Sequence, residues 1–179
     1  ETLAACFSLM FSLSIGSWGL FSAMVPRVKK IQLKTQKIED GLSFVQISDV
    51  HIGSRSRAFL ERLVRKIDSL SPKFLCITGD FIDATGVSRS ELASLQKLDC
   101  PIFFSIGNHE RYEDLNKIVE RLSSLGVNVL RSEVAYPCEE IQLIGIDDQE
   151  DAKQVKTELK KINVSQNAYT ILMYHRPKG

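Results

Sequence analysis

The sequence contains few histidines, few cysteines and almost no net charge. Its 179 residues include three histidines and four cysteines, and the cysteines are widely separated, at Cys6, Cys76, Cys100 and Cys138. The absence of a C-x-x-C pair argues against a thiolate metal site and fits a reducing compartment. The formal net charge is only +1, so bulk charge gives no indication of nucleic-acid binding and we expect none.

Charged residues are also absent from residues 2–25, where apolar residues dominate and five serines are interspersed. As a helix this segment would span about 36 Å, against a hydrocarbon core of about 30 Å. A basic cluster follows, made of Arg27, Lys29, Lys30, Lys34 and Lys37. The pattern predicts a single-pass membrane anchor over residues 1–26, with the catalytic domain cytoplasmic and the membrane as a partner. A cleaved signal peptide and a buried core helix are the alternatives.

The rest of the chain alternates between strand-like and helix-like segments, which is typical of an α/β fold with short loops. Residues 27–41 would hold the basic segment and a first strand, and residues 42–179 one further domain. The expected strands cover residues 31–38, 42–48, 73–78, 102–106, 127–130, 133–136, 141–146 and 168–174. The expected helices cover residues 57–70, 89–98, 114–125 and 152–162.

Four of the expected strands are each followed at once by side chains of the types that bind metals. In chain order they are Asp49, His51, Asp80, Asn108, His109 and His175. In α/β folds, groups just past the carboxyl ends of strands line the ligand crevice, so we expect these side chains to meet at one edge of a sheet. A mixture of imidazole and oxygen ligands suits zinc, manganese or iron better than a soft metal.

Taken one at a time, these residues have ordinary structural explanations. Asp-x-His arises often by chance, Asp80 could cap the segment after it, and a lone histidine such as His175 is more often a hydrogen-bonded structural residue than a ligand. The spacing nevertheless suits metal binding, because residues i and i+2 of an extended segment point the same way. One carboxylate can also bridge two cations about 3.5–4 Å apart.

Taken together, the motifs resemble the calcineurin-like metallophosphoesterase family. The matching residues, in the family's order, are Asp49-x-His51, Gly79-Asp80, Gly107-Asn108-His109-Glu110 and His175. Residues 41–53, 79–83 and 145–148 are further similar to the membrane-anchored bacterial branch of that family. The resemblance implies a four-layer αββα sandwich preceded by a transmembrane anchor.

The resemblance also implies two divalent metal ions, with manganese expected and iron or zinc as alternatives. The implied ligands are Asp49 and His51 for the first ion, Asp80 for both ions, and Asn108 and His175 for the second. His109 would face the substrate phosphate, stabilising the transition state or protonating the leaving group. A hydroxide bridging the metals would attack phosphorus in line.

One element of the family pattern does not occur in this sequence. The family has a Gly-His-x-His block, whose two histidines each complete one metal, and the sequence stops at Gly179 without it. Because residue 1 is Glu and the chain stops just after His175, we interpret the domain as truncated at its C-terminus.

The expected activity is hydrolysis of a phosphoric ester or anhydride in a phosphorylated small molecule or a lipid-linked substrate. UDP-2,3-diacylglucosamine, in lipid A synthesis, is one candidate. A phosphodiesterase, a protein phosphatase of the same family and a non-catalytic scaffold with this fold are the alternatives. A basic group after the first motif could meet a substrate phosphate or simply form a solvated helix face; its members are Arg55, Arg57, Arg62, Arg65 and Lys66.

Overall fold

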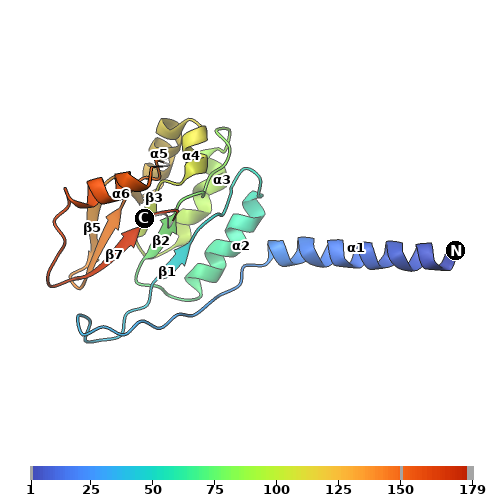
Figure 1. Ribbon diagram of the computed structural model, residues 1–179, viewed down its shortest axis with the longest axis horizontal. Helices are drawn as coiled ribbons and strands as arrows, with labels where there is room; N and C mark the ends of the chain where they lie inside the picture. The colour runs from blue at the N-terminus through green and yellow to red at the C-terminus, as the bar shows by residue number, and fades with distance from the viewer. Residues whose placement is uncertain (1, 150, 177–179) are drawn as a thin grey trace. The chain divides into compact units, whose positions relative to one another are not determined.

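The structure is a computed structural model that describes residues 2–149 and 151–176 (Figure 1). The chain divides into two compact units, which lie within residues 1–33 and 34–179. The first unit contains one long helix, α1 (Thr2–Met24). Ser14 turns its hydroxyl back onto this helix and donates a hydrogen bond of 2.8 Å to the carbonyl oxygen of Met10.

The predicted membrane anchor is corrected by the properties of α1. Within the described part of the chain, no helix combines the length and the apolar character needed to cross a membrane. The helix carries five serines and two glycines among its apolar residues, and these lower its mean hydropathy. The prediction of a single-pass anchor with a cytoplasmic catalytic domain was therefore wrong on this finding.

The strand expected over residues 31–38 is also absent. Residues 25–44, all of them described, form no helix or strand. Ile31 and Leu33, whose alternation suggested the strand, are 71% and 61% exposed. Further along, Ile38 and Phe44 pack against the core of the second unit, and Lys37 donates a hydrogen bond of 3.0 Å to the carbonyl oxygen of Ala168. Side-chain contacts and a backbone hydrogen bond of 2.9 Å from Lys73 to the carbonyl oxygen of Ser43 hold the end of this segment, in place of a strand ladder.

The second unit contains a four-stranded sheet in which all neighbouring strands are parallel. In spatial order the strands are β1 (Val45–Ile47), β2 (Leu75–Thr78), β3 (Ile102–Ser105) and β4 (Val127–Val129). The chain segments between these strands contain α2 (Arg57–Asp68), α3 (Arg89–Leu92), the 3-10 helix η1 (Ala93–Lys97), α4 (Asn108–Tyr112) and α5 (Leu115–Ser123). Because the strands are parallel, their carboxyl ends lie at one edge of the sheet.

A second sheet of three strands follows, in which the first pair is antiparallel and the second pair parallel. Its strands are β5 (Glu133–Cys138), β6 (Ile141–Gly145) and β7 (Tyr169–Met173), and α6 (Ala152–Leu159) lies between the last two in the sequence. The buried side chain of Gln142 on β6 makes four hydrogen bonds, which connect this strand to β5, to β7 and to residues 163–165.

Alternating side chains of the strands separate two cores. On β2, Leu75 and Ile77 face the core shared with α2, α3 and α5, while Cys76 faces the core between the two sheets. On β6, Leu143 belongs to the core between the sheets, whereas Ile144 packs with α6. The layers therefore run helix, sheet, sheet, helix. The prediction of an α/β fold with a parallel sheet is confirmed.

Local sequence explains where the helices begin and which faces they bury. The hydroxyl of Ser56 caps α2 by accepting from the backbone N–H of Phe59, and Asp114 caps α5 by accepting from Lys117. Each apolar side chain that is fully buried stabilises the fold by roughly 1.5–3 kcal/mol, and α2 buries five such residues: Phe59, Leu60, Leu63, Val64 and Ile67. The short helix α4 was not predicted, since no helix was expected between residues 98 and 114.

Candidate metal centre

The candidate residues lie just beyond the carboxyl ends of the strands, where the loops after β1 and β2 run side by side. The backbone N–H of Asp49 donates to the carbonyl oxygen of Gly79 at 3.2 Å. The backbone N–H of His51 donates to the carbonyl oxygen of Asp80 at 3.0 Å. A third bond, of 2.8 Å, links Ile52 to Phe81. Parallel pairing thus continues past the strands and brings the Asp-x-His motif beside Asp80.

Three of the candidate ligands adopt an unusual backbone conformation. Asp49, His51 and Asp80 have φ angles of 55°, 53° and 51°, in the left-handed region that residues other than glycine rarely occupy. Such a conformation costs of order 1–3 kcal/mol per residue and tends to occur at functional sites. The surrounding hydrogen bonds hold this strain where the candidate ligands meet.

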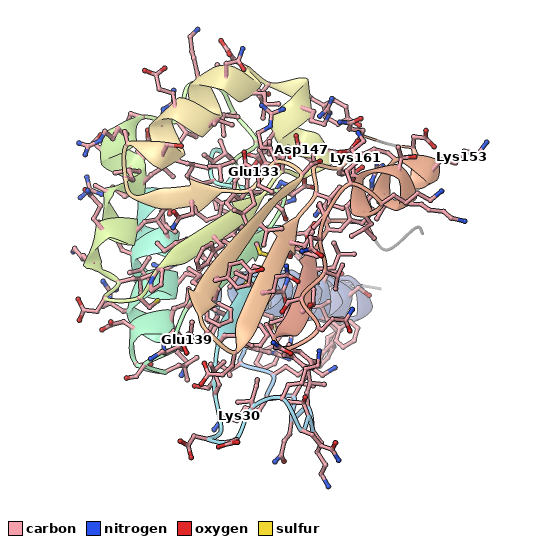
Figure 2. All side chains as sticks on the ribbon, turned by 90° about the vertical axis from the view of Figure 1, so that its left-hand side faces the viewer. Lys30, Glu133, Glu139, Asp147, Lys153 and Lys161 are labelled. Carbon is pink, nitrogen blue, oxygen red and sulfur yellow. The ribbon has the colours of Figure 1, made fainter. Side chains whose placement is uncertain are left out.

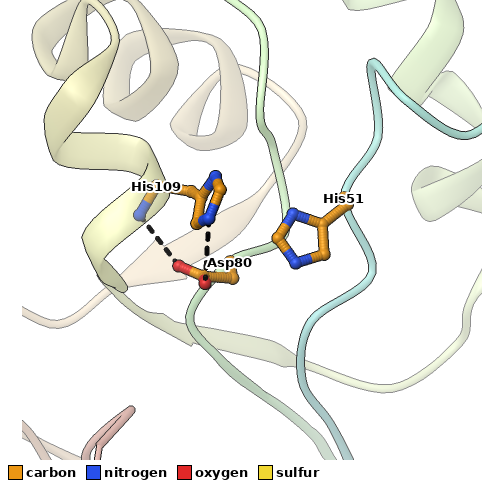
Figure 3. Close-up of side chains that lie close together, drawn as sticks. All are labelled: His51, Asp80 and His109. Carbon is orange, nitrogen blue, oxygen red and sulfur yellow. Dashed lines mark hydrogen bonds and ion pairs between the residues drawn. The ribbon is translucent and has the colours of Figure 1, made fainter.

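Asp80 lies at the centre of the site (Figure 3). Its side chain is almost completely buried, with the residue only 4% exposed. Oδ1 accepts a hydrogen bond of 2.9 Å from the backbone N–H of His109. Oδ2 lies 3.9 Å from Nε2 of His109 and 3.1 Å from Nε2 of His175. One carboxylate therefore contacts two histidines from different loops.

The orientation of His175 leaves a lone pair directed at Asp80. Its Nδ1 lies 2.9 Å from the carbonyl oxygen of Thr78, and since a carbonyl only accepts, Nδ1 is the donor. In a neutral ring Nε2 then carries the lone pair, and it faces an oxygen of Asp80 at 3.1 Å. Two acceptors at this distance repel each other unless a proton or a cation lies between them, and a divalent metal ion is one group that would fill this position.

His51 is oriented by Asp83, which sequence reasoning did not select. Nδ1 of His51 lies 3.4 Å from Oδ2 of Asp83, and the backbone N–H of Ser54 donates to the other oxygen at 2.9 Å. Burial raises the pKa of Asp83, but the hydrogen bonds from Ser54 and the charge of His51 outweigh it and lower the pKa overall. A carboxylate on one imidazole nitrogen leaves the other available as a metal ligand.

The ligand atoms form two groups that share Asp80. One group contains His51, Asp80 and His109, and the other Asp49, Asp80 and His175; within each, the ligand atoms lie within 4.8 Å of one another. Asp80, for which a bridging position was expected, belongs to both groups. The partition differs from the prediction, however, because Asp49 and His51 fall in different groups and His109 joins a ligand group. Asn108, at the start of α4, is half-buried.

Glu110 is a second residue that sequence reasoning left without a role. Its side chain is completely buried, at 0% exposure. The two carboxylate oxygens accept hydrogen bonds from the backbone N–H groups of Asp80, Phe81, Ile82 and Gly107. A Glu placed three residues after Gly107, at a helix start, was the available signal.

Two glycines allow the loops to approach closely. A Cβ atom on Gly79, whose φ is +81°, would lie 2.7 Å from the ring of His175 and from the Cα of Gly107. A Cβ atom on Gly107 would lie 2.5 Å from the backbone nitrogen of Asp80. Side chains at these positions would push apart the loops that carry Asp80 and His175.

An acidic pair follows β6, next to the site. Asp148 is fully buried and accepts hydrogen bonds from Nε and Nη2 of Arg176, the residue after His175. Asp147 pairs with Arg131, whose Nε lies 2.9 Å from Oδ2. Burial raises the pKa of Asp147, and the nearby Glu133, seen with it in Figure 2, raises it further, while Arg131 opposes both effects.

A cavity of about 800 Å³ lies away from the candidate ligands. It is lined by residues that precede the strands of the first sheet, among them Leu42, Lys73 and Pro101, and also by Glu140. These residues lie at the opposite edge of the sheet from Asp80. The metal-type cluster at the carboxyl edge, and not this cavity, is therefore the candidate functional site.

The fold and the possible ligand groups are consistent with a metal-dependent hydrolase domain, and residues 42–178 match the calcineurin-like phosphoesterase family. The chain belongs to this family. The expectation of a metallophosphoesterase, a phosphoester hydrolase domain, is confirmed at this level. The possible metal clusters also agree with the divalent metals expected for such a domain.

Individual relatives are similar over different shares of the chain. An uncharacterised metallophosphoesterase of Aquifex aeolicus is 28% identical over 181 residues, which cover 95% of this chain and 69% of the relative. A zebrafish transmembrane protein with a metallophosphoesterase domain is 30% identical over 80% of this chain and 36% of its own length. The UDP-2,3-diacylglucosamine pyrophosphatase LpxG of Chlamydia muridarum is 44% identical over 75 residues, or 39% of this chain and 23% of that protein.

Proposed function

We propose that the protein is a metal-dependent hydrolase of phosphoric esters or anhydrides that uses two divalent ions. The observation that supports this most strongly is the position of Asp80, which belongs to both groups of possible ligands. Imidazole and carboxylate ligands suit manganese, iron or zinc, and we propose manganese first. When bound, such ions lower the pKa of a bound water and neutralise charge on the phosphate oxygens.

The proposed ligands are those of the family resemblance, with Asp80 common to both ions. Asp49 and His51 would complete the first site, and Asn108 and His175 the second; this partition needs the ligand atoms to regroup on metal binding, because in the structure His51 groups with His109 and Asp49 with His175. The strained conformation of Asp49, His51 and Asp80 supports this assignment, because strain of this kind persists only where surrounding structure holds it. The orientation of Nε2 of His175 toward Asp80 supports it independently.

We propose His109 as the residue that acts on the substrate. Its side chain is the most exposed of the three histidines, at 44%, and is therefore accessible to an incoming phosphate. The ring packs edge-to-face against His51 and Tyr112, with centroid distances of 4.7 and 5.9 Å. Held in this way, the imidazole can stabilise charge on a phosphate oxygen or donate a proton to the leaving oxygen.

A nucleoside diphosphate linked to an acylated sugar is the substrate candidate that the comparisons support. The LpxG relative, named for UDP-2,3-diacylglucosamine, is 44% identical over 75 residues of this chain. A simple phosphodiester is the competing substrate, because every assigned residue would bind a metal ion or the phosphate, and none would contact the sugar, the base or the acyl chains.

The test is a hydrolysis assay with Mn²⁺ on two substrates in parallel. One is UDP-2,3-diacylglucosamine dispersed in detergent, with UMP as the measured product, and the other is bis(p-nitrophenyl) phosphate. Rapid, chelator-sensitive release of UMP supports the pyrophosphatase function. Hydrolysis of the aryl diester alone supports the phosphoesterase chemistry and removes this substrate. Failure on both, with metal bound, contradicts the proposed hydrolysis.

A further inference from the structure

Glu110 holds the bridging residue of the proposed site by its backbone. Oε2 accepts from the backbone N–H groups of Gly107 and Asp80, at 2.9 and 3.0 Å. Oε1 accepts from those of Phe81 and Ile82, at 2.6 and 3.0 Å. The carboxylate therefore spans two loops, the one after β2 and the one after β3, and each oxygen has two donors.

The neighbouring residue, His109, holds Asp80 from the other side. Its backbone N–H donates to the side-chain carboxylate of Asp80 at 2.9 Å, while Glu110 accepts from the backbone N–H of Asp80. Two successive residues of α4 thus hold both the main chain and the side chain of Asp80. Asp80 needs such support, because its φ of 51° lies in the left-handed region, which is unfavourable for a residue with a Cβ atom.

We propose that Glu110 is a positioning residue of the metal centre. Its carboxylate holds the loop of residues 80–82 so that Asp80 keeps the left-handed conformation in which one carboxylate reaches both groups of ligands. The inference rests on the proposed function, because it assigns Glu110 a role in metal affinity that goes beyond stabilising the fold. Glu110 itself is fully buried and contacts neither ion nor substrate in this account.

The variant that tests the inference is Glu110→Gln. Glutamine has nearly the same shape, but its NH₂ group cannot accept, so two of the four backbone donors lose their partner. Glu113→Gln is the matched control. Glu113 also accepts from the loop after β2, with Oε2 bonded to the backbone N–H of Thr85 at 2.8 Å and to the hydroxyl of the same residue. It acts further along the loop, away from Asp80.

The first readout is amide hydrogen exchange in the metal-free protein. Glu110→Gln should accelerate exchange among Asp80, Phe81, Ile82 and Gly107, by roughly tenfold or more at the two amides that lose their acceptor and by less at the two that keep a neutral amide oxygen. Glu113→Gln should leave these amides unchanged and accelerate exchange at Thr85. Unchanged exchange at residues 80–82 in a folded Glu110→Gln protein would overturn the inference.

The second readout is Mn²⁺ affinity by titration calorimetry. Residues that support metal ligands typically change affinity by about 10–100-fold when altered, and we expect a loss of this size in Glu110→Gln but not in Glu113→Gln. Faster exchange with unchanged Mn²⁺ affinity would mean that Glu110 only stabilises the loop, and the positioning role would be rejected.

The two proposals fail in different ways. A wild-type protein that binds no Mn²⁺ would contradict the proposed function, while exchange in the metal-free protein would still decide whether Glu110 holds Asp80. If Glu110→Gln does not fold, Glu110→Asp takes its place. That variant keeps both accepting oxygens on a side chain one methylene shorter, and the same two measurements apply with the same criteria.

Discussion

The backbone N–H of His109 donates to Oδ1 of Asp80 at 2.9 Å, while the imidazole of the same residue lies 3.9 Å from Oδ2. The main chain of His109 therefore supports Asp80, and its side chain is a separate element of the site. Substitution of the side chain leaves the backbone bond available. The two contributions of His109 can thus be separated by mutation.

His109→Ala should slow turnover of an aryl phosphodiester by about 10²–10⁴-fold, the usual contribution of a positioned acid or base. Mn²⁺ affinity should stay close to that of the wild type, because the proposed ligands are retained. Kinetics and calorimetry on the same preparation check both points. A large loss of metal affinity would instead make His109 a ligand, in line with its place beside His51 and Asp80.

Bound metal should stabilise the folded protein, and His175→Ala should reduce this effect. A ligand that binds only the folded state stabilises it by about 2.7 kcal/mol at a concentration one hundred times its Kd. In His175→Ala one proposed site loses an imidazole, so the rise in melting temperature with Mn²⁺ should shrink. Calorimetric scans with and without Mn²⁺ measure it. An equal rise in both proteins would remove His175 from the ligand set.

Gly79→Ala should destabilise the fold and weaken the metal centre together. Gly79 has a φ of +81°, and a Cβ there would lie 2.7 Å from the ring of His175. The conformation alone costs roughly 1–2 kcal/mol for a residue with a Cβ atom, and the contact adds to it. Gly86→Ala is the control, because no atom lies within 4 Å of its Cβ position. Equal urea midpoints for the two variants would contradict the close packing around Gly79.

Asp147 should make stability depend on pH with a defined sign. Burial raises its pKa in the folded protein, so the folded state keeps a proton that the unfolded chain has released. Its contribution is present below the ordinary pKa of the group and is lost as the pH rises through the raised pKa. Urea unfolding from about pH 3 to about pH 7 should therefore show a smaller fall in stability in Asp147→Asn than in the wild type.

Glu91→Gln should change the pH dependence of stability in the opposite direction. Hydrogen bonds from Ser88 lower the pKa of Glu91, so its contribution is present above its ordinary pKa and lost as the pH falls. The variant should remove stability that the wild type gains as the pH rises.

Identical pH profiles for Asp147→Asn and the wild type would contradict the effect assigned to Asp147.

Much of the second unit could be predicted from the pattern of apolar residues. The apolar run from Leu75 to Ile77 indicates a strand that is buried on both faces. The helical spacing of Leu60, Leu63 and Ile67 indicates a helix that is buried on one face. The edge of the sheet that carries the site was predictable too, because polar residues follow several of the expected strands. The grouping of ligands was not, because Asp49 and His51 both leave the extended conformation, and the i, i+2 rule assumed that they keep it.

Other features depend on partners that the sequence does not reveal. Ile31 and Leu33 alternate like a strand, but no neighbouring strand pairs with them within the described residues. Glu110 reads as an ordinary charged residue until the loop after β2 folds over it and supplies its donors. The uncharged stretch of α1 suggested an anchor, but no described helix has the length and apolar character to cross a membrane.

The central claim is that Asp80 bridges two metal ions, and Mn²⁺ titration of wild type and Asp80→Asn tests it most directly. Asparagine keeps the shape but removes the negative charge that both ions would share, so both sites should weaken at once. Two ions should bind to the wild type, and both should bind more weakly to Asp80→Asn. Loss of one ion alone, or two ions bound with unchanged affinity, would contradict the bridging role.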